Sequence, residues 1–185
     1  MPHTHIVDRN LAALLIIDVQ EKLAPHIAGH KIVIENTVKL IRAARVLELP
    51  ILATEQNPRR IGATVAPIRE ALPGDVKPLE KETFSCWGDA PFRAALGGTN
   101  REHVIVAGIE SHVCVLKTVL ELIRVDYVPF VLSDAVGSRR ESDRDAAIRR
   151  MREAGAVITT TESMILELLT SYTQPEFKPL LQIIK

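Results

Sequence analysis

The strongest constraint on this chain is an alternation of short, largely apolar runs with longer stretches of helical periodicity. Six runs of strand length stand at residues 12–19, 51–54, 76–80, 103–109, 128–132 and 157–160. Helical spacing of apolar side chains occurs at residues 32–49, 63–72, 111–123, 142–155, 162–169 and 175–184. A strand that is apolar on both faces requires a mostly parallel sheet with helices over both of its faces. We therefore predict an α/β fold, a three-layer α/β/α sandwich around a Rossmann-like sheet of about six strands.

Length and composition limit the classes of protein to which the chain can belong. Its 185 residues suffice for one sizeable core, so we predict a single domain over residues 1–185. A formal net charge of +0 offers no field for a phosphate backbone, and only 4% of the residues are aromatic. The longest apolar run, residues 11–17, is far shorter than the roughly 20 residues of a membrane helix. We therefore expect neither a nucleic-acid partner nor a membrane partner.

The N-terminus and the cysteine count indicate the compartment. Residues 1–10 contain no apolar segment ahead of a cleavage site, so we expect no signal peptide and a cytoplasmic protein. Cys86 and Cys114 are too few for a disulfide framework and are expected to be free thiols. His3 and His5 have the spacing of a metal-binding pair, but chain ends commonly fray, and we predict no metal there.

Local signals predict where several helices begin and end. Ser111 stands where the N-cap of a helix would lie, directly after the most apolar run. Ser142 and Asp145 have the spacing of a capping box, and Gly155 is expected to end that helix. Gly97 and Gly98 are interpreted as a turn ahead of a strand, because they lack the spacing of a dinucleotide-binding loop.

Three chemically active side chains follow predicted strands. Asp18 ends the first strand, Lys81 follows the third, and Cys114 lies in the first turn after the fourth. Taken singly, each has an ordinary interpretation, as a turn cap, a surface charge and a small buried residue respectively. A parallel sheet, however, gathers the carboxyl ends of its strands at one edge, where ligands bind. Acid, base and thiol in one crevice are the components of a cysteine hydrolase.

The position of Cys114 also leads to an expectation about its charge. Backbone N–H groups and the helix dipole favour a thiolate over a thiol in the first turn of a helix, and a nearby lysine adds to this effect. We therefore expect the pKa of Cys114 to be depressed.

Three motifs in order resemble those of the isochorismatase-like cysteine hydrolases, which include nicotinamidases, carbamoylsarcosine-type amidohydrolases and isochorismatases. They are residues 15–20 (LIIDVQ), residues 81–87 (KETFSCW) and residues 108–115 (GIESHVCV), within a likeness that runs from about residue 12 to residue 161. Residues 54–58 (TEQNP) and the tail residues 175–178 (PEFK) further resemble the isochorismatase-domain-containing branch. Members of that branch mostly lack an assigned substrate.

The resemblance implies a role for each motif. Cys114 would be the nucleophile, Asp18 the general base and Lys81 the cation that holds the thiolate. The family also has a non-proline cis peptide four residues before the nucleophile, here Ile109-Glu110, which directs the N–H groups matching Glu110 and Cys114 into an oxyanion hole. The expected reaction cleaves a C–N bond of a small molecule through a thioester, without a cofactor.

Departures from the family pattern narrow the substrate. Metal-binding nicotinamidases have an Asp-x-His pair after the second strand, where this chain has Glu55-Gln56-Asn57. We therefore predict that the protein binds no metal and that nicotinamide is not its substrate. Isochorismatases that cleave a vinyl ether usually have a small residue at the nucleophile position, whereas Cys114 is retained here. Gln20 is expected to brace the Asp18 loop, and the remaining pocket candidates are also compatible with ordinary core: Leu23, Phe84 and Trp87.

Alternatives remain open at this stage. The fold could serve a non-catalytic binding or assembly protein, or a vinyl-ether hydrolase that does not need Cys114. Cys86 lacks a charged neighbour that would activate it and is interpreted as structural, with a minor chance of a redox role. The resemblance implies a homo-oligomer, and an apolar tail offers a surface that a lone subunit would leave exposed: Leu180, Leu181, Ile183 and Ile184.

Overall fold

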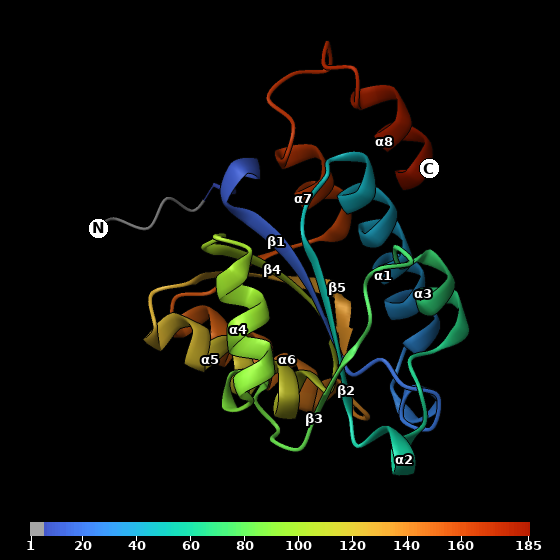
Figure 1. Cartoon of the computed structure of the whole chain (residues 1–185), viewed down its shortest axis with the longest axis vertical. Coiled ribbons are helices and arrows are strands. Elements are labelled where there is room, and N and C mark those ends of the chain that lie inside the picture. The colour runs from blue at the N-terminus through green and yellow to red at the C-terminus, as the bar shows by residue number, and fades with distance from the viewer. Residues whose placement is uncertain (1–5) are drawn as a thin grey trace.

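A computed structural model, which describes residues 6–185, has one sheet of six parallel strands in the order β3-β2-β1-β4-β5-β6, with helices on both faces (Figure 1). The strands are β1 (Ala12–Ile17), β2 (Ile51–Gln56), β3 (Leu79–Lys81), β4 (His103–Ile109), β5 (Val128–Gly137) and β6 (Val157–Thr159). The predicted α/β fold is confirmed, and the sheet is parallel throughout.

Eight α-helices connect and follow the strands within the described residues. They are α1 (His30–Val46), α2 (Pro58–Ile61), α3 (Ala66–Ala71), α4 (Ala90–Gly98), α5 (Leu116–Arg124), α6 (Glu141–Glu153), α7 (Thr161–Glu167) and α8 (Phe177–Ile184). A π-helical turn, Ser111–Val115, joins β4 to α5. None of the described helices is long and apolar enough to cross a membrane.

The central strand β1 divides the core into two halves. Its six residues are all buried, and successive side chains point to opposite faces of the sheet. Leu14 and Ile16 pack with α1, α3, α7 and α8, whereas Leu15 and Ile17 pack with α4, α5 and α6. Figure 1 shows these two sets of helices on opposite sides of the sheet. Both layers of helices therefore need β1 to be apolar on both faces, which explains its unbroken apolar sequence.

The strand order reverses beside β1, which pairs with β2 on one side and with β4 on the other. Ligands bind at the carboxyl ends of the strands at such a switch point. The two central strands approach closely there: Gly108 has φ 135°, and a Cβ on it would lie 2.2 Å from the carbonyl oxygen of Ile17. Only glycine fits this position.

Three local predictions were wrong. Gly97 and Gly98 end helix α4 instead of forming a turn, because Phe92 and Leu96, one helical turn apart, bury the helix against the core. Helix α6 begins at Glu141, one residue before the predicted capping box, and its N-cap residue makes no side-chain bond. Ser111 is also inside its helix and not the N-cap, which is the residue before it.

The C-terminal tail differs from its expected role as an exposed surface. Leu180 is fully buried, and Ile183 and Ile184 pack on the half of the core that α1 covers. The tail therefore completes the core of its own chain, and Arg9 pairs with Glu176 at 2.9 Å beside it. His3 and His5, in the N-terminal stretch, lie outside the described residues.

Candidate active site

Asp18 follows β1 directly and is completely buried. Its backbone is left-handed, with φ 53°, a conformation that Asp and Asn adopt more readily than most residues. The Thr54 hydroxyl at the end of β2 donates to Asp18 Oδ1 at 2.7 Å. Asp18 Oδ2 lies 2.7 Å from Lys81 Nζ and has no aligned hydrogen-bond donor among the described residues. One carboxylate oxygen is therefore held by a hydroxyl, and the other faces a cation.

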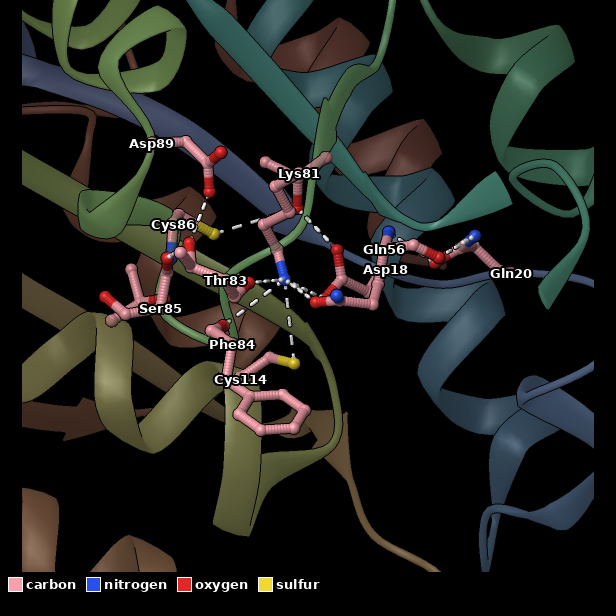
Figure 2. Close-up of polar contacts among 12 residues, drawn as sticks. Asp18, Gln20, Gln56, Lys81, Thr83, Phe84, Ser85, Cys86, Asp89 and Cys114 are labelled. Atoms are coloured by element: carbon pink, nitrogen blue, oxygen red, sulfur yellow. Dashed lines mark hydrogen bonds and ion pairs between the residues drawn. The ribbon is translucent and has the colours of Figure 1, made fainter. Parts of the chain in front are cut away.

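Lys81, the last residue of β3, is 3% exposed, and its ammonium is surrounded by acceptors (Figure 2). Nζ lies 2.7 Å from Gln56 Oε1, 3.1 Å from the Thr83 carbonyl and 3.2 Å from the Phe84 carbonyl, besides its ion pair with Asp18. Burial lowers the pKa of Lys81, but Asp18 and the nearby cysteines outweigh burial, so the pKa is raised from its ordinary value. The side chain is therefore a fixed positive charge.

Cys114 completes the group from the π-helical turn after β4. It is 6% exposed, and its sulfur lies 3.7 Å from Lys81 Nζ. Figure 2 shows the lysine ammonium between Asp18 and Cys114. The structure thus places the three side chains from strand ends β1, β3 and β4 in contact at the switch point, in the arrangement that the sequence indicated.

The pKa of Cys114 is shifted in the direction opposite to the one expected. Burial and the neighbouring Asp18 carboxylate raise the pKa of Cys114 to about 12, although Lys81 opposes them. The expected depressed pKa was wrong because burial of the sulfur and the nearby Asp18 carboxylate together outweigh Lys81, and the sequence shows neither of them. At neutral pH Cys114 is a thiol, with a carboxylate nearby that can take its proton.

Gln20 and Gln56 hold the loops around this group. Gln20 exchanges hydrogen bonds with the backbone of Gln56, at 2.8 and 3.1 Å, and donates to the Gly62 carbonyl at 2.6 Å. The Gln20 amide therefore joins the loop after β1 to the backbone at the end of β2, which is the bracing contact expected of it. Sequence reasoning missed Thr54 and Gln56, although both lie at the carboxyl end of β2, where the same strand-end rule would have found them.

The remaining pocket candidates differ in how deeply they are buried, and none of them lines the cavity beside Lys81. Leu23 and Trp87 are partly buried against opposite halves of the core. Phe84 is 54% exposed, and Lys117 Nζ lies 5.4 Å from the centre of its ring. A cavity of about 540 Å³ lies beside Lys81 outside β2 and β3, and its lining contains neither Asp18 nor Cys114: Gln56, Asn57, Pro58, Arg59, Glu80, Lys81, Glu82 and Asp89.

The turn before Cys114 carries the other predicted features. The peptide bond between Ile109 and Glu110 is cis. The Glu110 carboxylate is paired with Arg139 at 2.6 Å, so it is committed to an ion pair.

The segment at residues 55–57, where no metal was predicted, has partners within the protein, since Glu55 accepts hydrogen bonds from Thr64. In the part of the chain described, no three histidine, cysteine or acidic side chains form a group that could hold a metal ion.

Comparison with known proteins identifies the family. Residues 12–163 match the family model described as Isochorismatase domain. The chain belongs to the isochorismatase family. Isochorismatase domain-containing protein 2A of Mus musculus is 36% identical over 172 residues, covering 93% of this chain and 82% of the relative. The secreted isochorismatase effector Isc1 of Phytophthora sojae is 35% identical, covering 100% of this chain and 86% of the relative.

Solved structures of the isochorismatase fold match nearly the whole chain. The MAR1 ribonuclease structure from Caenorhabditis elegans has a TM-score of 0.92 and 36% identity, covering 97% of this chain and 92% of that one. YcaC from Pseudomonas aeruginosa, described with hexane-2,5-diol and covalent acrylamide, has a TM-score of 0.90 and 27% identity, covering 96% and 91%. Membership of this family supports a hydrolase whose substrate is unassigned.

Proposed function

We propose that the protein is a metal-independent cysteine hydrolase that cleaves the C–N bond of a small amide, ureide or related compound through a thioester. The observation that carries the proposal is the buried row of Asp18, Lys81 and Cys114, with Lys81 Nζ at 2.7 Å from the carboxylate and 3.7 Å from the sulfur. The site therefore brings a nucleophile, a proton acceptor and a fixed cation within reach of one another.

The first half of the reaction forms the acyl-enzyme. Asp18 takes the thiol proton of Cys114 as the sulfur attacks the substrate carbonyl carbon, and the electron pair of the C=O bond moves to oxygen. The backbone N–H groups of Glu110 and Cys114 would stabilise that oxyanion. Collapse of the tetrahedral intermediate breaks the C–N bond, and the proton held by Asp18 leaves with the nitrogen as ammonia or an amine.

The second half returns the enzyme to its starting state. Asp18 deprotonates a water molecule, which attacks the thioester, and the sulfur leaves as a thiolate. That thiolate recovers its proton from Asp18 as the carboxylic acid product departs. Lys81 stabilises the thiolate in both halves without exchanging a proton, in keeping with its raised pKa. Asp18 is therefore the only proton carrier that the mechanism needs.

Two features of this chain support the proposed reaction over its alternatives, a metal-dependent amidase and a vinyl-ether hydrolase. The segment that matches the metal-binding pair of nicotinamidases uses its side chains elsewhere, since Glu55 binds Thr64 and Gln56 binds Lys81. The acyl-enzyme route also accounts for a cysteine at position 114, which a vinyl-ether hydrolase would not need.

The test is a panel of small amides and ureides, with ammonia release measured under catalytic conditions. Wild type should release ammonia from at least one compound, and Cys114→Ser and Asp18→Asn should abolish release while the variants still unfold cooperatively from the native fold. Asp126→Asn is the matched control, because Asp126 has a similar φ of 66° and lies in the turn before β5, away from the strand carboxyl ends. Retained activity in both site variants would refute the mechanism.

Other outcomes separate the alternatives. Isochorismate cleavage that survives Cys114→Ala would indicate vinyl-ether hydrolysis. Absence of turnover on every compound would favour a binding or assembly protein on the same fold. RNA should be included, because the C. elegans relative is described as a ribonuclease, and RNA cleavage that needs Cys114 would replace the small-molecule proposal.

We also propose a homo-oligomer, prompted by the octameric YcaC of Escherichia coli, which matches this fold with a TM-score of 0.87 at 24% identity. Light scattering coupled to size exclusion would give the number of subunits. A monomer at micromolar concentration would contradict the proposal. A cytoplasmic location is proposed with it, and fractionation of cells that express the protein would test it, since the P. sojae relative is described as secreted.

A further inference from the structure

Cys86 is a second buried thiol that the proposed reaction does not use. It is completely buried, lies in the short helical turn after β3, and its backbone N–H donates to Thr118 on α5 at 2.9 Å. Its sulfur lies 3.7 Å from Thr54 Oγ1, which in turn lies 2.7 Å from Asp18 Oδ1. A chain of three polar groups therefore runs from a buried thiol to the proposed general base.

The direction of hydrogen bonding along this chain follows from the number of hydrogens. An ionised carboxylate can only accept, so the single hydrogen of the Thr54 hydroxyl must point to Asp18. The hydroxyl has no second hydrogen, and its contact with Cys86 is possible only if the thiol donates. Burial in the first place, and then Asp18, raise the pKa of Cys86 to about 12, so the thiol keeps that hydrogen at neutral pH.

This direction distinguishes the two oxygens of Asp18. Oδ1 is occupied by a donor that cannot easily reverse, because Thr54 already accepts from Cys86. Oδ2 has the ion pair with Lys81 but no aligned hydrogen-bond donor among residues 6–185. A proton on Oδ1 would compete with the Thr54 hydrogen for that oxygen, whereas Oδ2 accepts from no hydroxyl or amide among residues 6–185, so Oδ2 is the favoured acceptor of a proton taken from Cys114.

We infer that Thr54 and Cys86 are positioning residues, which act through Asp18 by holding Oδ1 as an acceptor and directing the transferred proton to Oδ2. The inference rests on the proposed role of Asp18 as the base for Cys114. A hydrogen bond to the charged form of a carboxylate favours that form, so the Thr54 hydroxyl also keeps the proton on Cys114 until a substrate arrives.

The experiment measures alkylation of Cys114 by iodoacetamide across pH 6–10, resolved from Cys86 by peptide mass spectrometry. Thr54→Val removes the hydroxyl at nearly constant volume, which shifts the proton from Cys114 towards Asp18. Alkylation at neutral pH should then become about tenfold faster or more, the factor expected for a hydrogen bond to a charged group. Thr54→Ser keeps the hydroxyl and should restore the wild-type profile.

The two variants of Cys86 test the thiol end of the hydrogen-bonded series Cys86–Thr54–Asp18. Cys86→Ala removes the donor and should accelerate alkylation by about two- to fivefold, since a thiol is a weak donor. Cys86→Ser keeps a donor and should return the profile to that of wild type. Both variants leave Cys114 as the one remaining cysteine, which simplifies the assay. If Thr54→Val does not fold, this pair still decides the inference.

A double variant shows whether the effect passes through Asp18. In an Asp18→Asn background, Thr54→Val should change the alkylation rate by less than about twofold. An unchanged pH profile in Thr54→Val, or equal rates in Cys86→Ala and Cys86→Ser, would overturn the inference. Alkylation does not require turnover, so it tests the inference independently of the proposed reaction. If the variants show the predicted alkylation rates but no amide is hydrolysed, the proposed reaction is refuted and the positioning role of Thr54 and Cys86 stands.

Discussion

Removing the carboxylate of Asp18 should make Cys114 more reactive towards alkylating agents while abolishing turnover. Asp18→Asn keeps the size of the side chain and tolerates the left-handed backbone at φ 53°. Lys81 retains Gln56 and two backbone carbonyls as acceptors and therefore stays charged. The sulfur of Cys114 then faces a cation without the anion that now opposes its ionisation.

The distances set the size of the effect. Because Lys81 Nζ lies 2.7 Å from Asp18 Oδ2 and 3.7 Å from the Cys114 sulfur, the carboxylate oxygen and the sulfur are at most about 6.4 Å apart. At an effective dielectric of about 20, two unit charges at that separation repel by about 2.6 kcal/mol. Removing this repulsion raises the thiolate fraction roughly 80-fold. The thiolate becomes less nucleophilic as its pKa falls, so the rate of alkylation should rise about tenfold.

The assay is the pseudo-first-order rate of iodoacetamide labelling of Cys114 at pH 7, with peptide mass spectrometry to separate Cys86. Asp126→Asn should label at the wild-type rate, because it removes the same charge far from the sulfur. If Asp18→Asn is labelled no faster than wild type, the carboxylate does not hold the proton on Cys114. The electrostatic account of the site would then be wrong.

Three further predictions concern stability, and each is measured by denaturant unfolding. Lys81→Met leaves Asp18 buried without its cation and should lower the free energy of unfolding by about 3–5 kcal/mol. Gly108→Ala forces a Cβ to 2.2 Å from a β1 carbonyl and should cost at least about 3 kcal/mol, whereas Gly155→Ala, with open space around it, should cost about 1 kcal/mol. The pKa of the Cys86 thiol is about 12 in the folded protein and 9 in the unfolded chain. The protonated thiol therefore contributes its full stabilisation below pH 9, and this contribution is lost as the pH rises from 9 towards 12. Above pH 9 the stability of Cys86→Ala should therefore fall less steeply than that of wild type, by about 1.4 kcal/mol per pH unit, and parallel curves would contradict this account.

The sequence predicted the sheet and the meeting of three side chains for one physical reason. Buried parallel strands must be apolar on both faces, and their carboxyl ends must share an edge. Asp18, Lys81 and Cys114 could be placed from these two rules alone. The fold assignment was confirmed by the structure, whereas the catalytic roles of these residues stay predictions.

What could not be predicted depends on distances between segments remote in sequence. The pKa of Cys114 is set by burial of the sulfur and by the opposing charges of Asp18 and Lys81, and no spacing along the chain shows the outcome. Helix α4 was missed because its two terminal glycines suggested a turn, while its burial depends on contacts with the sheet. Leu180 was expected at the surface, since the sequence does not show that α1 offers it a place in the core.

The strand order also has a consequence for biosynthesis. The central strand β1 is made early, but its neighbour β4, with residues 103–109, is made about half a chain later. Until then a nascent chain exposes one edge of an entirely apolar strand, which is prone to pair with other chains. Parallel pairing across such a separation is also intrinsically slow. Chaperone dependence during translation should therefore end once β4 has emerged from the ribosome, and truncated chains that stop before residue 103 should aggregate.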